Sequence, residues 1–318
     1  MEVFKVSNME PPLPSTNFVY KKGSLARLGE TLKENSRKQN SSFKQNTNFF
    51  LDSNLLTQLS INDFQILSQN GLIELTKKGY IWNFMPVFSD NLLFYCDLPK
   101  FKTFNNYVWL SDKFSGGSWT FARSLPVNKG DRVLDLGTGT GLLALMSRLK
   151  KGTVYGVDIN PRAVQLAQFN RDLNGLNSVE FQVRNWNSVD KYHFDIVVSQ
   201  PPFGFSLGQL GLAFNGGGDT GLEATKDIIR RFCPQDDQIL CLFVHALEND
   251  THSRFLHLLQ EWIDDKSVLI DLQPQNSYSS RIWWERLLKK QCLNPSYPFP
   301  SEFQSYKEVV SYFVYLSR

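Results

Sequence analysis

The residues with the clearest chemical meaning lie between Val133 and Gly141. An apolar run contains Asp135, and glycines follow at positions 137, 139 and 141. Glycines permit backbone conformations and a close ligand approach that a Cβ atom would block. The spacing does not match the G-x-G-x-x-G dinucleotide pattern, and Asp135 would repel a pyrophosphate but attract a cationic amino group. The segment therefore predicts a binding turn for a ligand with such a group, and a plain tight turn is the alternative.

A second acidic residue, Asp158, closes the next strand that the sequence predicts, residues 153–158. It follows Gly141 by seventeen positions. A carboxylate at the end of this strand can accept hydrogen bonds from both ribose hydroxyls of a bound nucleoside. The alternative is a helix-capping role before Asn160 and Pro161.

A third element, Gln200-Pro201-Pro202-Phe203, follows a predicted strand at residues 194–199. Prolines stiffen the exit of the strand, and the backbone carbonyls there can accept hydrogen bonds from a bound amino group. An amide side chain, two prolines and an aromatic ring form a compact receptor for a planar nitrogen. A turn that only ends the strand is the alternative.

Alternating strands and helices must position these residues. Predicted strands at 132–136, 153–158, 179–183, 194–199 and 238–245 are separated by helical stretches such as 141–150, 161–174 and 222–232. This alternation predicts a parallel sheet with helices on both faces. Two later strand candidates, 268–272 and 309–316, complete a Rossmann-like seven-stranded α/β domain closed by an antiparallel hairpin, which we assign to residues 101–318.

Residues 1–100 are predicted to form a smaller accessory α+β module. Ser60 and Asp63 have the spacing of a helix capping box, and residues 72–75 and 80–82 have the pattern of a hairpin. A helix followed by a hairpin is typical of a winged-helix-like module. The polar stretch from Lys33 to Asn48 is predicted to be a loop or linker.

Together, Asp135 to Gly141, Asp158 and residues 200–203 resemble the class I S-adenosylmethionine methyltransferases. More narrowly, they resemble the branch with an (Asn/Asp)-Pro-Pro-(Tyr/Phe) motif, which includes the HemK-type glutamine methyltransferases of release factors and the small-domain rRNA guanine methyltransferases. Residues 215–222 are similar to a glycine-rich element of the HemK type. The resemblance covers about Trp109 to Arg318.

This resemblance implies S-adenosyl-L-methionine as the cofactor. The residues implied to bind it are Asp135, Gly137, Thr138, Gly139, Gly141, Asp158, Ile159, Asn185, Trp186 and Gln200. Among them, Asp135 would bind the methionine amino group through water or the backbone of the glycine turn. Asp158 would bind the ribose, and Asn185 would contact the adenine with Trp186 beside it. The N-terminal module would then govern the acceptor, so that a fragment beginning near Leu98 would still bind the cofactor.

The resemblance implies Gln200, Pro201 and Phe203 as the catalytic residues that hold the acceptor nitrogen. Gln200 departs from the Asn or Asp of the family, because it adds a methylene and a rotatable bond to the amide. Since positioning is most of what such an enzyme supplies, this change could redirect the acceptor or slow the reaction.

Composition sets further limits. With 318 residues, 42% hydrophobic and 20% charged, the chain has the balance of a globular protein. A net charge of +3 without a Lys/Arg-rich stripe neither requires nor excludes a nucleic-acid partner. The four cysteines lie far apart, so we predict no metal site. No apolar run approaches the roughly 20 residues that span a bilayer, so we predict a cytoplasmic protein without a membrane partner.

We therefore expect an enzyme that methylates an amide or amine nitrogen, on a small specialised metabolite or a protein side chain. Methylation of an RNA base nitrogen is the alternative, favoured slightly by the wing-like module. A catalytically silent cofactor-binding protein is a further alternative, suggested only by Gln200. The sequence predicts no oligomeric state.

Overall fold

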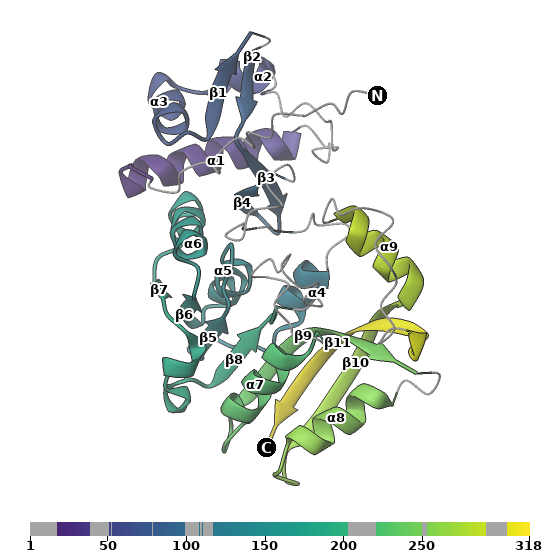
Figure 1. The fold of residues 1–318 in the computed structure, drawn as a ribbon. Helices are drawn as coiled ribbons and strands as arrows, with labels where there is room; N and C mark the ends of the chain where they lie inside the picture. Colours follow the sequence, from purple (N-terminus) through teal and green to yellow (C-terminus); the bar gives the residue numbers. More distant parts are fainter. Residues whose placement is uncertain are drawn as a thin grey trace, which may run out of the picture.

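The computed structural model describes residues 18–38, 51, 53–77, 79–98, 108, 110, 117–202, 221–249, 253–290 and 304–318. Within these residues, a small N-terminal α/β module lies at one end of a seven-stranded sheet that carries helices on both faces (Figure 1). The predicted Rossmann-like fold class is confirmed. No helix in the described ranges is both long enough and apolar enough to cross a membrane.

The large sheet has the strand order β10-β11-β9-β8-β5-β6-β7. Its strands are β5 (Arg132–Leu136), β6 (Thr153–Asp158), β7 (Val179–Val183), β8 (Ile196–Ser199), β9 (Ile239–Glu248), β10 (Leu269–Ser279) and β11 (Glu308–Ser317). The five neighbouring strands β9, β8, β5, β6 and β7 are parallel. β11 runs antiparallel to both of its neighbours, β9 and β10. The seven predicted strands are thus present, although β10 is longer than predicted.

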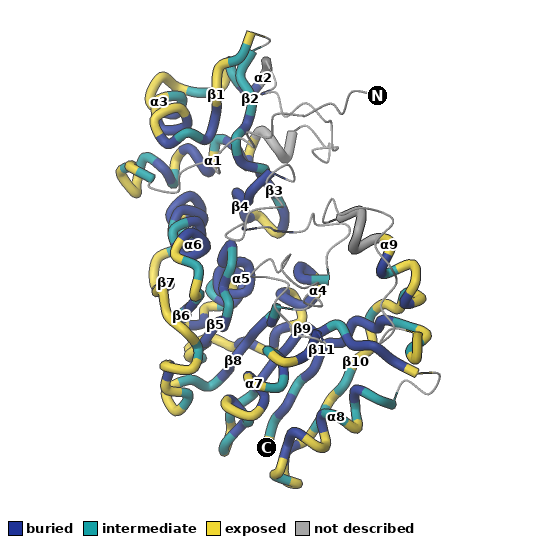
Figure 2. The backbone as a smooth tube through the Cα atoms, viewed as in Figure 1, coloured by how far each residue is buried: buried dark blue, intermediate teal, exposed yellow. Residues whose placement is uncertain are grey.

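Helices cover the middle of the sheet because its central strands, β5, β8, β9 and β11, are mostly buried on both sides, whereas the edge strands β7 and β10 are partly exposed. Along β5, Val133 packs with α4 (Gly117–Ser124), α5 (Leu142–Leu149) and α6 (Pro161–Leu173). The alternate residues Leu134 and Leu136 pack with α7 (Glu223–Phe232) and α8 (Arg254–Trp262) on the other side. Figure 2 shows the resulting buried strands between these two layers. Such continuous burial is typical of a parallel sheet covered on both faces.

The N-terminal module begins with three helices, followed by two hairpins. Its elements are α1 (Lys22–Lys38), α2 (Ser53–Gln58), α3 (Ile61–Gln69), β1 (Ile73–Thr76), β2 (Gly79–Trp82), β3 (Phe84–Ser89) and β4 (Leu92–Asp97). The predicted capping box precedes α3, because Ser60 Oγ accepts from the Asp63 N–H at 3.2 Å and the Asp63 carboxylate accepts from the Ser60 N–H at 3.1 Å. The predicted hairpin is β1–β2.

Two features of this module differ from the predictions. The start of the stretch from Lys33 to Asn48 is helical, because α1 continues to Lys38 and buries Leu25, Leu28 and Leu32; residues 39–48 lie outside the described ranges. The β3–β4 hairpin was not predicted. Its turn residues Asp90 and Asn91 have φ angles of 51° and 64°, as a tight two-residue hairpin turn requires.

The core of the module includes one face of α6. Leu166, Phe169 and Leu173 of α6 lie in the same buried cluster as the leucines of α1 and the aromatic residues of β3 and β4. The module and the sheet therefore share this helix. The domain boundary near residue 100 stays a prediction.

Candidate functional site

The glycine turn begins where β5 ends. Gly137, Gly139 and Gly141 have φ angles of 69°, 56° and 87°, in a region that residues with a Cβ atom rarely adopt. The N–H groups of Gly137 and Thr138 both donate to the carbonyl of Val157 at 2.9 Å, so the turn is tied to β6. The predicted glycines thus shape an open backbone loop at the carboxyl edge of the sheet.

Asp135 lies directly beneath this turn. Its side chain is 1% exposed, and its Oδ2 accepts from the Thr138 hydroxyl at 2.7 Å and from the Ala144 N–H at 3.1 Å. Its Oδ1 is buried and has no hydrogen-bond partner among the residues that the structure describes. Burial raises the pKa of Asp135 to about 7, although the bonds from Thr138 and Ala144 oppose this shift. One oxygen of this buried carboxyl group is therefore left without a hydrogen-bond donor.

Asp158 ends β6 beside the turn. Its Oδ2 accepts from the Gly139 N–H at 2.9 Å, and its Oδ1 accepts from the Asn160 N–H at 2.9 Å. Burial raises the pKa of Asp158, while these backbone N–H groups lower it. The cap of α6 is Asn160, whose side chain accepts from the Arg162 N–H at 3.0 Å. Because a carboxylate can accept about four hydrogen bonds, each oxygen of Asp158 can still accept a ligand hydroxyl.

The residues predicted to flank the adenine follow β6 and β7. The Ile159 side chain is 64% exposed, and Asn185 is also exposed. The Asn185 Oδ1 accepts from the Asn187 N–H at 2.8 Å, which caps the short helix η2 (Trp186–Ser188). Trp186 instead turns towards α7, where its Nε1 donates to Asp227 at 2.8 Å. Ile159 and Asn185 are thus at the same sheet edge as the turn.

The Gln200-Pro201-Pro202 segment leaves the sheet next to the glycine turn. Leu136 and Ser199 are opposite each other in the β5–β8 pairing, and the Ser199 hydroxyl donates to the Leu136 carbonyl at 2.8 Å. The first residues after the two strands are therefore neighbours. Pro201 is buried, whereas Gln200 and Pro202 are half-buried. Phe203 lies outside the described residues, as do the residues that follow it up to 220.

Two residues that support the turn were missed by the sequence analysis. A Cβ atom on Gly156 of β6 would lie 2.6 Å from the Phe181 ring and 3.0 Å from the Thr138 hydroxyl, so this glycine lets the turn pack on the sheet. Asn170 of α6 is fully buried and donates to the Thr140 carbonyl at 3.0 Å. The available signals were a lone glycine inside a strand and a polar residue on an apolar helix face.

These features fit S-adenosylmethionine, which carries a ribose and a cationic amino group. The fit rests on the unpartnered Oδ1 of Asp135, on the half-buried carboxylate of Asp158 and on the open glycine turn between them. Among the described residues, no group of three His, Cys, Asp or Glu side chains could hold a metal ion.

Comparisons with known proteins identify a methyltransferase domain in this chain. Residues 127–231 match a family model described as a methyltransferase domain. A release factor glutamine methyltransferase of Aliivibrio fischeri is 46% identical over 77 residues, which cover 22% of this chain and 26% of that protein. A putative protein N5-glutamine methyltransferase of Methanocaldococcus jannaschii is 36% identical over 112 residues, which cover 33% of this chain and 53% of that protein.

Among solved structures, the SAM-dependent methyltransferase of Agrobacterium tumefaciens has a TM-score of 0.46 and 16% identity, covering 79% of this chain and 78% of that one. The two curated relatives are matched over only about a quarter and about half of their lengths. The family match nevertheless includes the glycine turn, Asp158 and the Gln200-Pro201-Pro202 segment. The chain therefore contains a class I S-adenosylmethionine-dependent methyltransferase domain.

Proposed function

We propose that this chain is an S-adenosylmethionine-dependent methyltransferase that methylates a nitrogen, with the side-chain amide of a protein glutamine as its leading acceptor. One observation carries this proposal. The glycine turn after β5 and the Gln200-Pro201-Pro202 segment after β8 leave the sheet at neighbouring positions, because Leu136 and Ser199 are paired. A cofactor on the turn and an acceptor on the prolines would then be adjacent.

The residues of the turn would hold the cofactor. When bound, S-adenosylmethionine supplies a methyl group that its positively charged sulfur has already activated. Asp135 Oδ1 would attract the amino group, and Asp158 would accept hydrogen bonds from the ribose hydroxyls. The exposed side chain of Ile159 offers an apolar surface for the adenine ring.

The residues after β8 would hold the acceptor. The Gln200 side-chain oxygen and the Pro201 carbonyl would accept hydrogen bonds from the acceptor N–H groups. Two acceptors fixed in this way orient the nitrogen lone pair, and orientation supplies most of the rate enhancement when the donor is already reactive. The half-buried position of Gln200 is consistent with contact to both protein and ligand.

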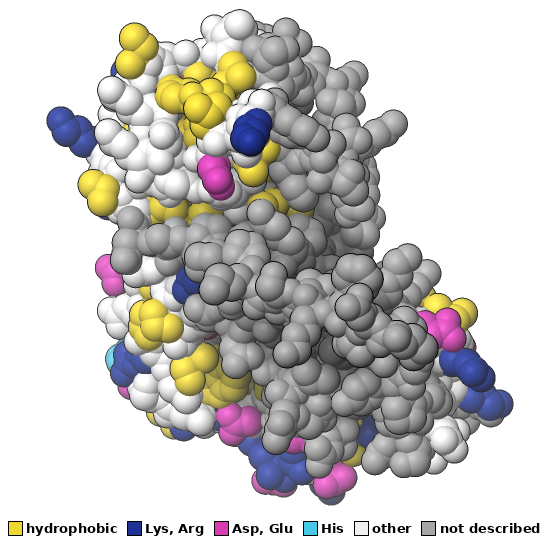
Figure 3. All heavy atoms as spheres, turned by 45° about the horizontal axis from the view of Figure 1, so that its top comes forward, with side chains coloured by type: hydrophobic (Ala, Val, Ile, Leu, Met, Phe, Trp, Pro, Cys, Tyr) yellow, Lys and Arg dark blue, Asp and Glu magenta, His cyan; other side chains and the backbone are white. Residues whose placement is uncertain are grey.

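Two observations favour a protein amide over RNA. Both curated relatives described above are named for the methylation of glutamine. On the described part of the face in Figure 3, Lys and Arg side chains are scattered, and several lie beside Asp and Glu side chains. A nucleic-acid-binding surface usually has clustered Lys and Arg, because it must neutralise several phosphates.

Transfer of a labelled methyl group tests the acceptor. The purified chain would be incubated with methyl-labelled cofactor and, separately, with release factors, total RNA and a protein-free metabolite extract. We expect label in a release-factor peptide, and hydrolysis should yield N5-methylglutamine by mass spectrometry. Label only in RNA or in a small molecule would overturn the glutamine assignment. Cofactor binding by calorimetry without transfer to any fraction would overturn the proposed activity and support a silent binding protein.

A further inference from the structure

Helix α6 pairs with strand β4 through two asparagine side chains. The Asn174 amide accepts from the Leu93 N–H at 2.9 Å and donates to the Leu93 carbonyl at 2.7 Å. One turn earlier, the Asn170 amide accepts from the Tyr95 N–H at 2.8 Å and donates to the Tyr95 carbonyl at 3.1 Å. The two amides thus satisfy the edge of β4 in the way that a neighbouring strand would.

The two asparagines differ in their second amide hydrogen. Asn174 Nδ2 also donates to the backbone carbonyl of Asn170 at 2.7 Å, within its own helix. Asn170 Nδ2 also donates to the Thr140 carbonyl at 3.0 Å, inside the glycine turn. Of these two asparagines, only Asn170 therefore bonds to both the β3–β4 hairpin and the glycine turn.

The Thr140 carbonyl belongs to a peptide group that glycine makes easy to rotate. The same peptide group carries the Gly141 N–H, which donates to the Thr138 carbonyl at 2.8 Å. Gly141 has a φ angle of 87°, and glycine populates both signs of φ with similar ease. Without Asn170, only one end of this peptide group would be held by these bonds. The buried amide therefore restricts a segment that its own sequence leaves flexible.

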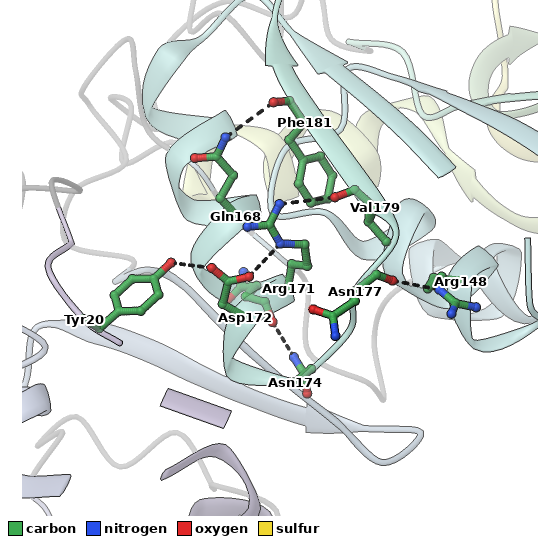
Figure 4. Close-up of polar contacts among 10 residues, drawn as sticks. Tyr20, Arg148, Gln168, Arg171, Asp172, Asn174, Asn177, Val179 and Phe181 are labelled. Atoms are coloured by element: carbon green, nitrogen blue, oxygen red, sulfur yellow. Dashed lines mark hydrogen bonds and ion pairs between the residues drawn. The ribbon is translucent and has the colours of Figure 1, made fainter. Parts of the chain in front are cut away.

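Other polar contacts attach the N-terminal residues to α6 without reaching the turn. Asp97, at the end of β4, forms a buried ion pair with Arg162, whose Nη2 lies 2.6 Å from Asp97 Oδ1. Tyr20 donates to Asp172 at 2.9 Å, and Figure 4 shows this contact reaching α6 from the chain before α1. Loss of Asn174 alone should therefore loosen the hairpin without releasing it.

We infer that Asn170 is a positioning residue that couples the N-terminal hairpin to the cofactor turn. Its bonds to the β4 backbone hold the amide in place, and the fixed amide in turn holds the Thr140 carbonyl of the cofactor turn. The inference rests on the proposed function, because it takes the glycine turn as the cofactor site. The contacts that connect the two segments are contiguous, because one side chain bonds both to the β4 backbone and to the Thr140 carbonyl.

The test compares Asn170→Ala with the matched control Asn174→Ala in the full chain. Both variants lose a two-way bond to β4, so both should lower the melting temperature. Only Asn170→Ala should weaken cofactor binding, by about tenfold, because only it frees the turn. Calorimetry with S-adenosylmethionine measures affinity at a temperature where both variants are folded. Asn170→Ser, which leaves a smaller cavity, replaces the alanine variant if that one does not fold.

Equal effects of the two variants on affinity, or no effect of either, would overturn the inference and leave Asn170 with a structural role. Amide exchange of Gly141 gives an independent readout that needs no cofactor. The exchange should be faster in Asn170→Ala than in Asn174→Ala. If the wild-type chain binds no cofactor, the proposed function fails. The exchange comparison then still decides whether Asn170 restrains the turn.

Discussion

Replacing Asp135 with Asn would separate the cost of a buried carboxylate from its use in binding. The amide can keep the acceptor that receives hydrogen bonds from Thr138 and Ala144. Its NH2 group would then occupy the place of Oδ1, which has no partner. A protonated Asp135 also has an unpartnered polar group there, so the two proteins should have similar stability at low pH.

The difference in stability between the wild type and Asp135→Asn should grow as pH rises. The pKa of Asp135 is raised from 3.8 to about 7 by burial, so between these values the unfolded chain releases a proton that the folded chain retains. Rising pH therefore favours unfolding of the wild type until about pH 7, where the penalty is complete. At about 1.36 kcal/mol per pH unit, this span corresponds to roughly 4 kcal/mol. The Asn variant does not titrate at this position and should become the more stable protein.

Denaturant unfolding at several pH values from 4 to 8 would measure this difference. Asp195→Asn is a control of opposite sign, because the hydrogen bond from Arg132 lowers the pKa of the half-buried Asp195. That contribution is present at neutral pH and is lost as pH falls through the folded-state pKa. Parallel profiles for wild type and Asp135→Asn would refute the reasoning, since they would mean that the Asp135 carboxyl titrates as it does in the unfolded chain.

The cofactor affinity of the wild type should rise with pH, whereas its stability falls. A cationic amino group at Oδ1 favours the ionised carboxylate, so wild-type affinity should rise with pH up to about pH 7. Asp135→Asn should bind more weakly and should lose this pH dependence. A variant that binds as tightly as the wild type at pH 8 would remove Asp135 from the proposed cofactor site.

Three further predictions concern the rest of the site. Asp158→Ala should weaken cofactor binding by about 10- to 100-fold, or roughly 1–3 kcal/mol, and unchanged affinity in calorimetry would exclude the ribose role. A fragment beginning at Leu98 should not fold stably, because it exposes the face of α6 that the module covers; cooperative melting with wild-type cofactor affinity would contradict this. Gln200→Ala and Gln200→Asn should both lower turnover at nearly unchanged cofactor affinity. Wild-type methylation rates in both would place the acceptor elsewhere.

The parts of the site that the sequence predicted are those set by local geometry. The spacing of Gly137, Gly139 and Gly141 predicts a backbone with positive φ angles, and Asp158 is the last residue of an apolar strand. In both cases the chemistry of the residue and its place in the element are visible within a few positions. The order of the strands in the sheet then follows from the topology that the fold class implies.

The parts that could not be predicted depend on distant residues. All six residues of β4 are buried, and a strand without apolar–polar alternation cannot be distinguished from other apolar segments by its period. The role of Asn170 depends on the packing of three segments, because its amide on α6 contacts both β4 and the glycine turn. This packing is not visible in the sequence around Asn170. The sequence predicted a loop for the start of the Lys33–Asn48 stretch because those residues are polar. They are helical because α1 begins earlier, at Lys22, and is held by the buried leucines of its first turns.

The apolar pattern of α6 explains why a fragment beginning at Leu98 should not fold stably, although the sequence alone predicted that it would still bind the cofactor. Val164 and Ala167 pack on the sheet side, whereas Leu166, Phe169 and Leu173 pack into the N-terminal module. A helix that is apolar on two faces must be covered on both. Since α6 begins at Pro161, three positions after Asp158, loss of its outer cover would disturb the residue proposed to bind the ribose. The module can therefore serve the acceptor and still be needed for the cofactor site, and point substitutions test its role better than truncation.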